Sequence, residues 1–348
     1  MKKTTILALL ASTMIASAAG AQTTVTIPAM SIYGRVDAGV QNYDTGTDSL
    51  YRAADSPYLG SQLGFKGSSP DLGGGIKLNW QLQGGLRPNT AQLGSTSSTG
   101  AIFAEEAWVG ISGSAGEIRL GTTDLSAAGE LDTLSRQFAK FGNFAQNGSA
   151  IEIGTDASNV IKYISPTIGG LQLQGGYSGN SVSATTDAKT AIKSGSVTYT
   201  AGKLTAGVGM ANKAATTSVG KTDATTVGAA YDLGIAKVGA AYIKGDNSTT
   251  TDVTSTSAQY SAMIPLDNKG LAAHVVYLTS KDGAQTTANE GTGYTLGLSK
   301  TLAPGAVVYG AYSKVTNEAN SAMFSNGMTA PAAGKDPSLF TVGISYTF

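Results

Sequence analysis

The stretch "FTVGISYTF", residues 340–348, alternates strictly between two kinds of residue. Small or polar residues separate large apolar ones, which are Phe340, Val342, Ile344, Tyr346 and Phe348. A period of two places successive side chains on opposite faces of a β-strand. The stretch therefore predicts a strand with one apolar and one polar face.

The same alternation recurs in "IKLNWQLQGGL" (76–86) and "LQLQGGY" (171–177). Short stretches rich in Gly, Pro, Asn and Asp, which are typical of hairpin turns, join such segments in pairs. Seven hairpins are predicted, with turns at 68–75, 112–116, 165–170, 200–203, 231–234, 265–270 and 303–305. A first strand at 32–43 and a last strand at 337–348 bring the predicted total to 16.

Long polar connections alternate with these short turns along the chain. They are predicted at 44–57, 87–101, 123–158, 179–192, 212–224, 245–252, 281–292 and 316–336. An even strand number with short turns at one end and long loops at the other is typical of outer-membrane barrels. Closing the sheet turns the apolar faces to lipid and the polar faces to a lumen, and leaves no sheet edge. We therefore predict an all-β protein, a closed antiparallel transmembrane β-barrel of 16 strands.

The segment "MKKTTILALLASTMIASAAGA" (1–21) has two lysines, an apolar run and a closing Ala-Gly-Ala. This is the pattern of a signal peptide. Its apolar run is shorter than the roughly 20 residues that a spanning helix needs. We expect cleavage after Ala21 and a single barrel domain, 22–348, in the outer membrane. The alternative is an uncleaved anchor helix.

Composition argues against several other functions. The chain has 23 basic and 23 acidic residues, so that loss of the two leader lysines gives a net charge of −2 and no strong field for nucleic acid. His274 is the one histidine, and no motif supplies it with a nucleophile, so we expect no enzyme. Cysteine is absent, which excludes thiolate zinc sites. "DTGTD" (44–48) could hold calcium only weakly, and we expect no cofactor.

Charged residues recur on the polar faces of the predicted strands. If the strands alternate strictly, the following charged side chains point toward the lumen: Arg35, Asp37, Lys66, Lys77, Glu106, Glu117, Arg119 and Lys162. On the lipid face a basic residue at the membrane centre would cost about 2–4 kcal/mol, and rings of lumen charge select ions. The alternative is ordinary solvated charge. Strict alternation would turn Glu105 to lipid unless a bulge turns it inward or it lies at the rim.

The third long connection, about 123–158, is the longest. Loops of more than about 15 residues are usually functional or disordered, and folding into the lumen would give this one a function. Its charged residues are Asp124, Glu130, Asp132, Arg136, Lys140, Glu152 and Asp156. The alternative is a mobile external loop.

Several motifs resemble those of the general-diffusion porins of betaproteobacteria. They are "SIYGRVDAGV", "LGFKGSSPDLGGGIKLNWQLQGG", "AWVGISGSAGEIRLGT" and "YISPTIGGLQLQGGY". The resemblance implies a 16-stranded barrel, usually a homotrimer, with the third loop folded inward. It also implies that the barrel-assembly machinery reads Phe348.

The chain departs from this family at two positions. The resemblance implies arginines in "SRLG" and "FGRQAW", but this chain has "SQLG" with Gln62 and "FAEEAW" with Glu105. We therefore expect a pore that is weakly cation-selective or nearly unselective. Two classes of function remain open: passive diffusion of small hydrophilic solutes, with a substrate-specific channel as a variant, and a binding or adhesion barrel acting through its external loops.

Overall fold

The computed structural model describes residues 30–94, 101–125, 131, 134, 144–145, 156–179, 191–214, 221–248, 252–281, 287, 289–325 and 331–348. The predicted leader and most of the predicted third loop lie outside these ranges. Within them, no helix has the length and apolarity that crossing a membrane requires.

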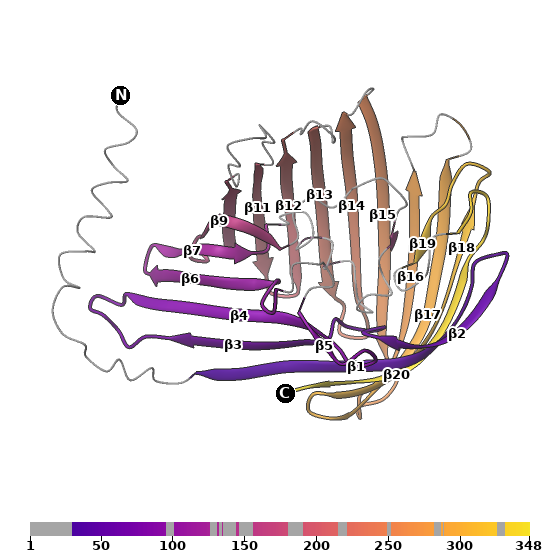
Figure 1. Cartoon of the computed structure of the whole chain (residues 1–348), viewed down its shortest axis with the longest axis horizontal. Helices are drawn as coiled ribbons and strands as arrows, with labels where there is room; N and C mark the ends of the chain where they lie inside the picture. Colours follow the sequence, from indigo (N-terminus) through magenta and orange to yellow (C-terminus); the bar gives the residue numbers. More distant parts are fainter. Residues whose placement is uncertain are drawn as a thin grey trace.

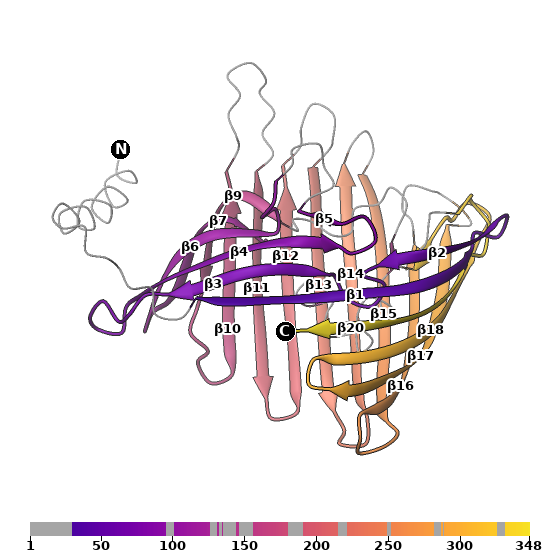
Figure 2. The same ribbon diagram turned by 60° about the horizontal axis from the view of Figure 1, so that its bottom comes forward.

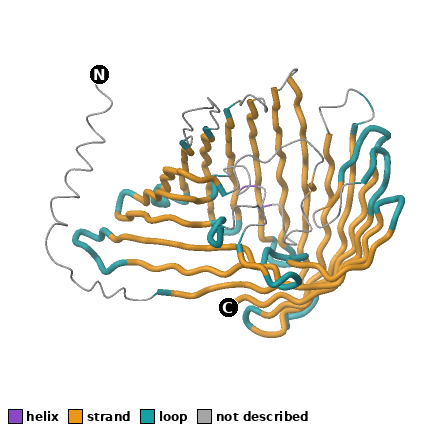
Figure 3. Tube along the Cα trace, viewed as in Figure 1, coloured by secondary structure: helices purple, strands orange, loops and turns teal. Residues whose placement is uncertain are grey.

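Strands make up most of the described chain, as the orange tube in Figure 3 shows. The long strands are β1 (Ser31–Asp44), β2 (Ser49–Asp55), β3 (Gln62–Ser68), β4 (Lys77–Arg87), β6 (Glu106–Gly113), β7 (Gly116–Thr123), β9 (Ala157–Ile164), β10 (Leu171–Ser178), β11 (Ile192–Ala201), β12 (Leu204–Lys213), β13 (Lys221–Asp232), β14 (Lys237–Ser248), β15 (Asp252–Pro265), β16 (Leu271–Lys281), β17 (Glu290–Ala303), β18 (Ala306–Asn317) and β20 (Ser338–Thr347). Three two-residue strands are β5 (Gln92–Leu93), β8 (Phe144–Ala145) and β19 (Phe324–Ser325).

The long strands form one closed antiparallel wall. β2 and β3 pair with successive halves of β1, so together they occupy one position in the wall, and the short β5 pairs with β4. The wall therefore has 16 strand positions. The closing seam, which is the pairing of β1 with β20, runs from Arg35 opposite Thr347 to Asp44 opposite Ser338 (Figure 1). The predicted fold is confirmed.

All seven predicted short turns join strands that pair with each other in the wall. In the shortest, Ala303 pairs with Ala306, and Gly305 adopts a positive φ of 79° that glycine accommodates without strain. Figure 2 shows the turns between β11 and β12 and between β13 and β14 at the same end of the barrel.

Several predicted boundaries differ from the structure, among them those of the loops 212–224, 245–252 and 281–292, into which strands extend. The predicted long loop 44–57 is mostly strand, because β1 and β2 continue as a hairpin in which Arg52 donates hydrogen bonds to Gln41 Oε1 at 3.0 and 3.1 Å. The predicted strand 58–67 begins only at Gln62. The predicted strand 102–111 begins at Glu106.

The two faces of the wall differ as the alternation predicts. On β20, the side chains of Phe340, Val342, Ile344 and Tyr346 are 44–51% exposed and face outward. Thr341 is fully covered on the inner face. Apolar side chains also dominate the outward faces of the other strands, as contact with lipid requires.

The inner face is not polar throughout. A buried apolar cluster lies on the inward side of β1, β16, β18 and β20, with Tyr58 and Phe324 packed against it. Its members are Tyr43, Val276, Leu278, Tyr309, Ala311 and Leu339. This part of the interior is therefore filled by side chains of the wall and by segments folded over it.

Candidate functional site

A hydrogen-bonded row of polar side chains crosses the inner faces of β1, β3 and β4. Gln81 Nε2 donates to the Tyr33 hydroxyl at 2.7 Å, and that hydroxyl donates to Gln83 Oε1 at 2.8 Å. Gln83 Nε2 in turn donates to Glu105 Oε2 at 2.8 Å and to Gln62 Oε1 at 3.4 Å. Glu105 lies in the irregular chain before β6, and this segment turns its carboxylate inward, to the same side as Gln83. Glu105 is therefore on the lumen side, although strict alternation would turn it to lipid.

A second polar group occupies the inner faces of β4, β6 and β7. Arg119 and Glu117 form an ion pair at 2.9 Å, and Asn79 Nδ2 donates to Glu117 Oε1 at 3.2 Å. The Arg119 guanidinium also lies 4.2 Å from the centroid of the Trp108 ring, a cation–π distance. These contacts hold Arg119 against the wall.

The predicted lysines occupy three different settings. Lys66 Nζ lies 5.0 Å from the centroid of the Tyr33 ring. Lys162 Nζ donates to the Asp124 carbonyl at 3.0 Å. Lys77 is the exposed first residue of β4, opposite Ser112. The basic residues are therefore spread along the wall rather than gathered at one point.

Four carboxylates, by contrast, converge at one side of the lumen. They belong to Glu105, Glu106, Asp124 and Asp156, from the chain before β6, β6 itself, and the two ends of the third loop. Burial, together with the charges of Glu105, Asp124 and Glu106, raises the pKa of Asp156 to about 7. A raised carboxyl pKa is the expected result of crowded like charges.

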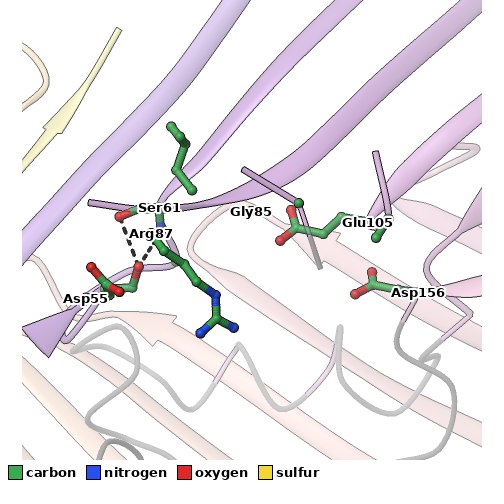
Figure 4. A pocket seen from close by; sticks show the side chains of 11 residues that line it. Asp55, Ser61, Gly85, Arg87, Glu105 and Asp156 are labelled. Atoms are coloured by element: carbon green, nitrogen blue, oxygen red, sulfur yellow. Dashed lines mark hydrogen bonds between the residues drawn. The ribbon is translucent and has the colours of Figure 1, made fainter. Parts of the chain in front are cut away.

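Two of these acids, Glu105 and Asp156, border a cavity of about 370 Å³. Figure 4 shows the carboxylates of Glu105 and Asp156 on one side of it and Ser61 and Asp55 on the other, with Arg87 between them. The charged residues that line the cavity are therefore three acids, Asp55, Glu105 and Asp156, and one base, Arg87. Such a lining offers a hydrated cation carboxylate oxygens with which to interact.

Asp37 and Arg35 differ from the other predicted lumen charges. The Asp37 side chain has no exposed area, because residues 56–61 cover it. Arg35 Nε donates to the Gly60 carbonyl in the same segment at 2.8 Å. Asp37 and Arg35 therefore form hydrogen bonds with the segment 56–61 of the same chain.

Three leucines of the predicted third loop are described, and two of them, Leu125 and Leu131, are almost fully covered. Leu125 contacts the inner face of β10, and Leu131 contacts the inner faces of β12 and β13 at Gly207 and Gly228. A Cβ built on Gly228 would collide with the backbone carbonyl of Leu131, so glycine permits this approach where a larger residue would not. The loop charges Glu130, Asp132, Arg136, Lys140 and Glu152 lie outside the described residues.

These leucines and the aromatic pair Tyr58–Tyr309 were not among the predicted site residues. The sequence does contain one signal for the docked leucines, which is glycine at the lumen-facing positions 207 and 228 of β12 and β13. Glycine at such positions leaves room for a side chain from another segment. His274, placed on the lumen side by alternation, is 5% exposed, and its Nε2 lies 2.8 Å from Ser299 Oγ. Within the described residues, no grouping of His, Asp or Glu is suited to a metal ion.

Comparisons with known proteins agree with this geometry. A family model described as Gram-negative porin matches residues 5–320. Outer membrane porin protein 32 of Delftia acidovorans is 30% identical, with 100% of both chains covered. Major outer membrane protein P.IB of Neisseria gonorrhoeae is 31% identical over 35% of this chain and 32% of that protein.

Solved structures give the same picture. The anion-selective porin from Comamonas acidovorans superposes with a TM-score of 0.79 at 25% identity, covering 92% of this chain and 99% of that one. OmpF of Salmonella typhi, in complex with daunomycin, has a TM-score of 0.67 at 16% identity, covering 92% of this chain and 97% of that one. The latter likeness is one of fold alone.

Proposed function

The chain belongs to the Gram-negative porin family and is an outer-membrane porin through which small hydrophilic solutes diffuse passively, and on this premise we propose that its third loop narrows the pore and that the pore is weakly cation-selective or nearly unselective. The proposed pore wall, with the constriction as part of it, includes Arg35, Gln62, Lys66, Lys77, Glu105, Glu106, Glu117, Arg119 and Lys162. Asp37, which was also predicted there, is covered by residues 56–61. Catalysis forms no part of the proposal.

The contacts of Leu125 and Leu131 support an inward third loop. A leucine side chain buried against the inner wall removes apolar surface from water, worth about 1.5–3 kcal/mol for each residue. An external loop would leave both side chains without this packing. The inward course of the loop, which also brings in Asp124 and Asp156 at its two ends, is therefore the arrangement that these contacts favour.

The converging carboxylates are the observation that carries the selectivity proposal. The similar Comamonas porin is anion-selective, and the family resemblance implies arginines where this chain has Gln62 and Glu105. The change from a base to a neutral residue and from a base to an acid alters the lumen by three charge units. Each charge acts on a passing ion by about 1 kcal/mol at 4 Å in water, and by more where the dielectric constant is lower. A shift away from anion preference follows.

Reversal potentials across a planar bilayer with a KCl gradient test the proposal. The double variant Gln62→Arg and Glu105→Arg should move the reversal potential toward anions, without closing the pore. Thr47→Arg with Asp48→Arg makes the same change of charge at the tip of the β1–β2 hairpin and serves as the matched control. High salt should weaken the difference, because screening then acts within a few ångströms.

Two results would contradict the selectivity proposal. One is a strongly anion-selective wild-type channel. The other is a lumen double variant whose reversal potential equals that of the hairpin control, which would mean that positions 62 and 105 do not face the path of the ions.

The same proposal includes processing and assembly. Cleavage after Ala21, a homotrimer and recognition of Phe348 by the barrel-assembly machinery are supported by the leader pattern and by the family resemblance. The mass of the mature protein tests the cleavage site, and chemical cross-linking in outer membranes tests the trimer.

A further inference from the structure

The second strand of the wall contains a surplus segment, residues 56–61, which we call the inner strap. Ala38 of β1 pairs with Asp55, and Arg35 pairs with Gln62. Two residues of β1 therefore lie opposite six residues of the partner strand. The four surplus residues leave the ladder, so β2 and β3 are two pieces of one interrupted strand.

The inner strap runs over the lumen face of the wall. Asp37 points inward between the outward-facing Val36 and Ala38, and its carboxylate accepts hydrogen bonds from the Leu59 N–H at 2.9 Å and the Tyr58 N–H at 3.4 Å. The Asp37 N–H donates to Ser61 Oγ at 2.9 Å. The strap is thus bound to β1 in two ways: its backbone N–H groups donate to the Asp37 carboxylate, and its Ser61 hydroxyl accepts from the Asp37 backbone N–H.

A third strand completes the attachment. Tyr309 reaches from β18 across β20 at Gly343, and its hydroxyl donates to Asp37 Oδ1 at 2.9 Å. A Cβ at position 343 would collide with this hydroxyl. The ring of Tyr58 stacks on that of Tyr309, with centroids 4.7 Å apart and planes 20° apart. The strap therefore lies over the closing seam and is held from β1 and β18 together.

The strap also bounds the acidic cavity. Ser56, Gly60 and Ser61 line the cavity of about 370 Å³, and Glu105 and Asp156 line it from elsewhere (Figure 4). We propose that the inner strap is a second, built-in narrowing element of the pore, separate from the third loop, and that Asp37 is the positioning residue that holds it in the lumen. This inference rests on the proposed function of the chain as an open pore.

A deletion of residues 57–60 tests the proposal directly. It removes the four surplus residues, so that Ser56 and Ser61 fall opposite Asp37 and Val36 and the ladder becomes continuous in register. The expected result is a folded barrel with a higher single-channel conductance than the wild type and a size limit shifted to larger neutral sugars in liposome swelling. Heat modifiability in detergent gels checks folding.

A single-atom change provides a second test that leaves the chain length intact. Tyr309→Phe removes the hydroxyl that binds Asp37, and Tyr312→Phe makes the same change on the outward face of the same strand. Tyr309→Phe should increase open-channel current noise as the strap loosens, and Tyr312→Phe should not.

The outcomes separate this proposal from the function on which it rests. A wild-type protein that forms no channel would contradict the proposed function. A folded deletion variant with wild-type conductance and size limit would overturn the strap proposal alone. If the deletion variant does not fold, equal noise in Tyr309→Phe and Tyr312→Phe overturns it.

Discussion

Two aspartates of the lumen have opposite surroundings, and this difference assigns their roles. Asp37 is fully covered and accepts hydrogen bonds from Tyr58, Leu59 and Tyr309, so its carboxylate is stabilised by donors that it holds in place. Asp156 lies among other carboxylates, which disfavour its ionised form. The first residue is suited to fixing structure, and the second to changing its charge near neutral pH.

Ion selectivity should depend on pH through Asp156. Its pKa of about 7 means that the side chain is neutral at lower pH and negative at higher pH. The ratio of cation to anion permeability should therefore rise as pH increases from about 6 to about 8, by up to about fivefold for an interaction of about 1 kcal/mol. Reversal potentials in a KCl gradient at each pH measure this ratio.

Two control variants isolate the titrating group. Asp156→Asn should flatten the pH profile, whereas Asp48→Asn, at the tip of the β1–β2 hairpin, should leave it unchanged. Histidine is the side chain type that ordinarily changes charge near neutral pH, so His274→Gln should be measured alongside. A profile that persists in Asp156→Asn and disappears in His274→Gln would show that the histidine is responsible.

At the scale of elements, two segments use the same means of attachment to the inner wall. Leu131 of the third loop lies against glycines of β12 and β13, and the inner strap lies where Gly343 lets Tyr309 pass. In each place the missing side chain of a wall residue makes room for a residue from another segment. Close backbone approach of this kind is a recognised use of glycine in strands.

Shortening the docked leucine should loosen the third loop. Leu131→Ala removes three buried carbon atoms, Cγ and the two methyl groups, a change that costs roughly 2–5 kcal/mol in a packed interior. The expected result is a noisier channel of higher conductance. Leu296→Ala, which removes the same atoms from the outward face of β17, is the matched control. Wild-type conductance and noise in Leu131→Ala would contradict the proposed loop position.

The wall could be predicted from the sequence because its signals are local. A period of two is visible within a single segment such as 76–86, and glycine-rich turns mark where each hairpin reverses. The inner strap could not, because residues 58–61 read as the start of the predicted strand 58–67, and only the pairing with β1 shows that four residues are surplus. Likewise, Glu105 follows strict alternation in the sequence, but an irregular segment before β6 redirects it.

The packing of the interior was also hidden from the sequence. Alternation assigns Leu278, Leu339 and Tyr309 to the lumen face, where a polar lining was expected, but the sequence does not state that other segments cover them. Such coverage depends on contacts between residues far apart in the chain, for example the 272 positions between Asp37 and Tyr309. The lumen lining therefore requires the three-dimensional structure.

At the scale of the molecule, the closing seam is the step that turns a sheet into a pore. It extends beyond β20, because the Phe348 N–H donates to the Gly34 carbonyl and the Gly34 N–H donates to the Phe348 carbonyl, both at 3.0 Å. The Phe348 ring also lies against Gly34. One residue thus contributes two backbone hydrogen bonds and an aromatic contact to closure.

Changing Phe348 should affect assembly more than the finished barrel. Phe348→Ala keeps both backbone hydrogen bonds and loses an aromatic contact worth at most about 1.5–3 kcal/mol. Deletion of Phe348 loses the aromatic contact and the two backbone hydrogen bonds. We expect less barrel in the outer membrane with either variant, and more so with the deletion. Quantitative blotting of outer-membrane fractions measures the amount, and gel mobility before and after heating measures the folded fraction. Normal abundance of both variants would refute a role in assembly.

The surplus in the second strand is an even number, and this has a consequence for how such a wall can change. An odd surplus would exchange the lipid-facing and water-facing sides of everything that follows it in the strand. Four residues leave that phase intact, so β3 continues the pattern of β2 with Phe65 outward and Lys66 inward. Inserts of even length at positions 57–60 should therefore be accepted without disturbing the membrane surface. The strap is a natural grafting point, where a recognition peptide placed inside the channel would turn the passage of an analyte into a change of current.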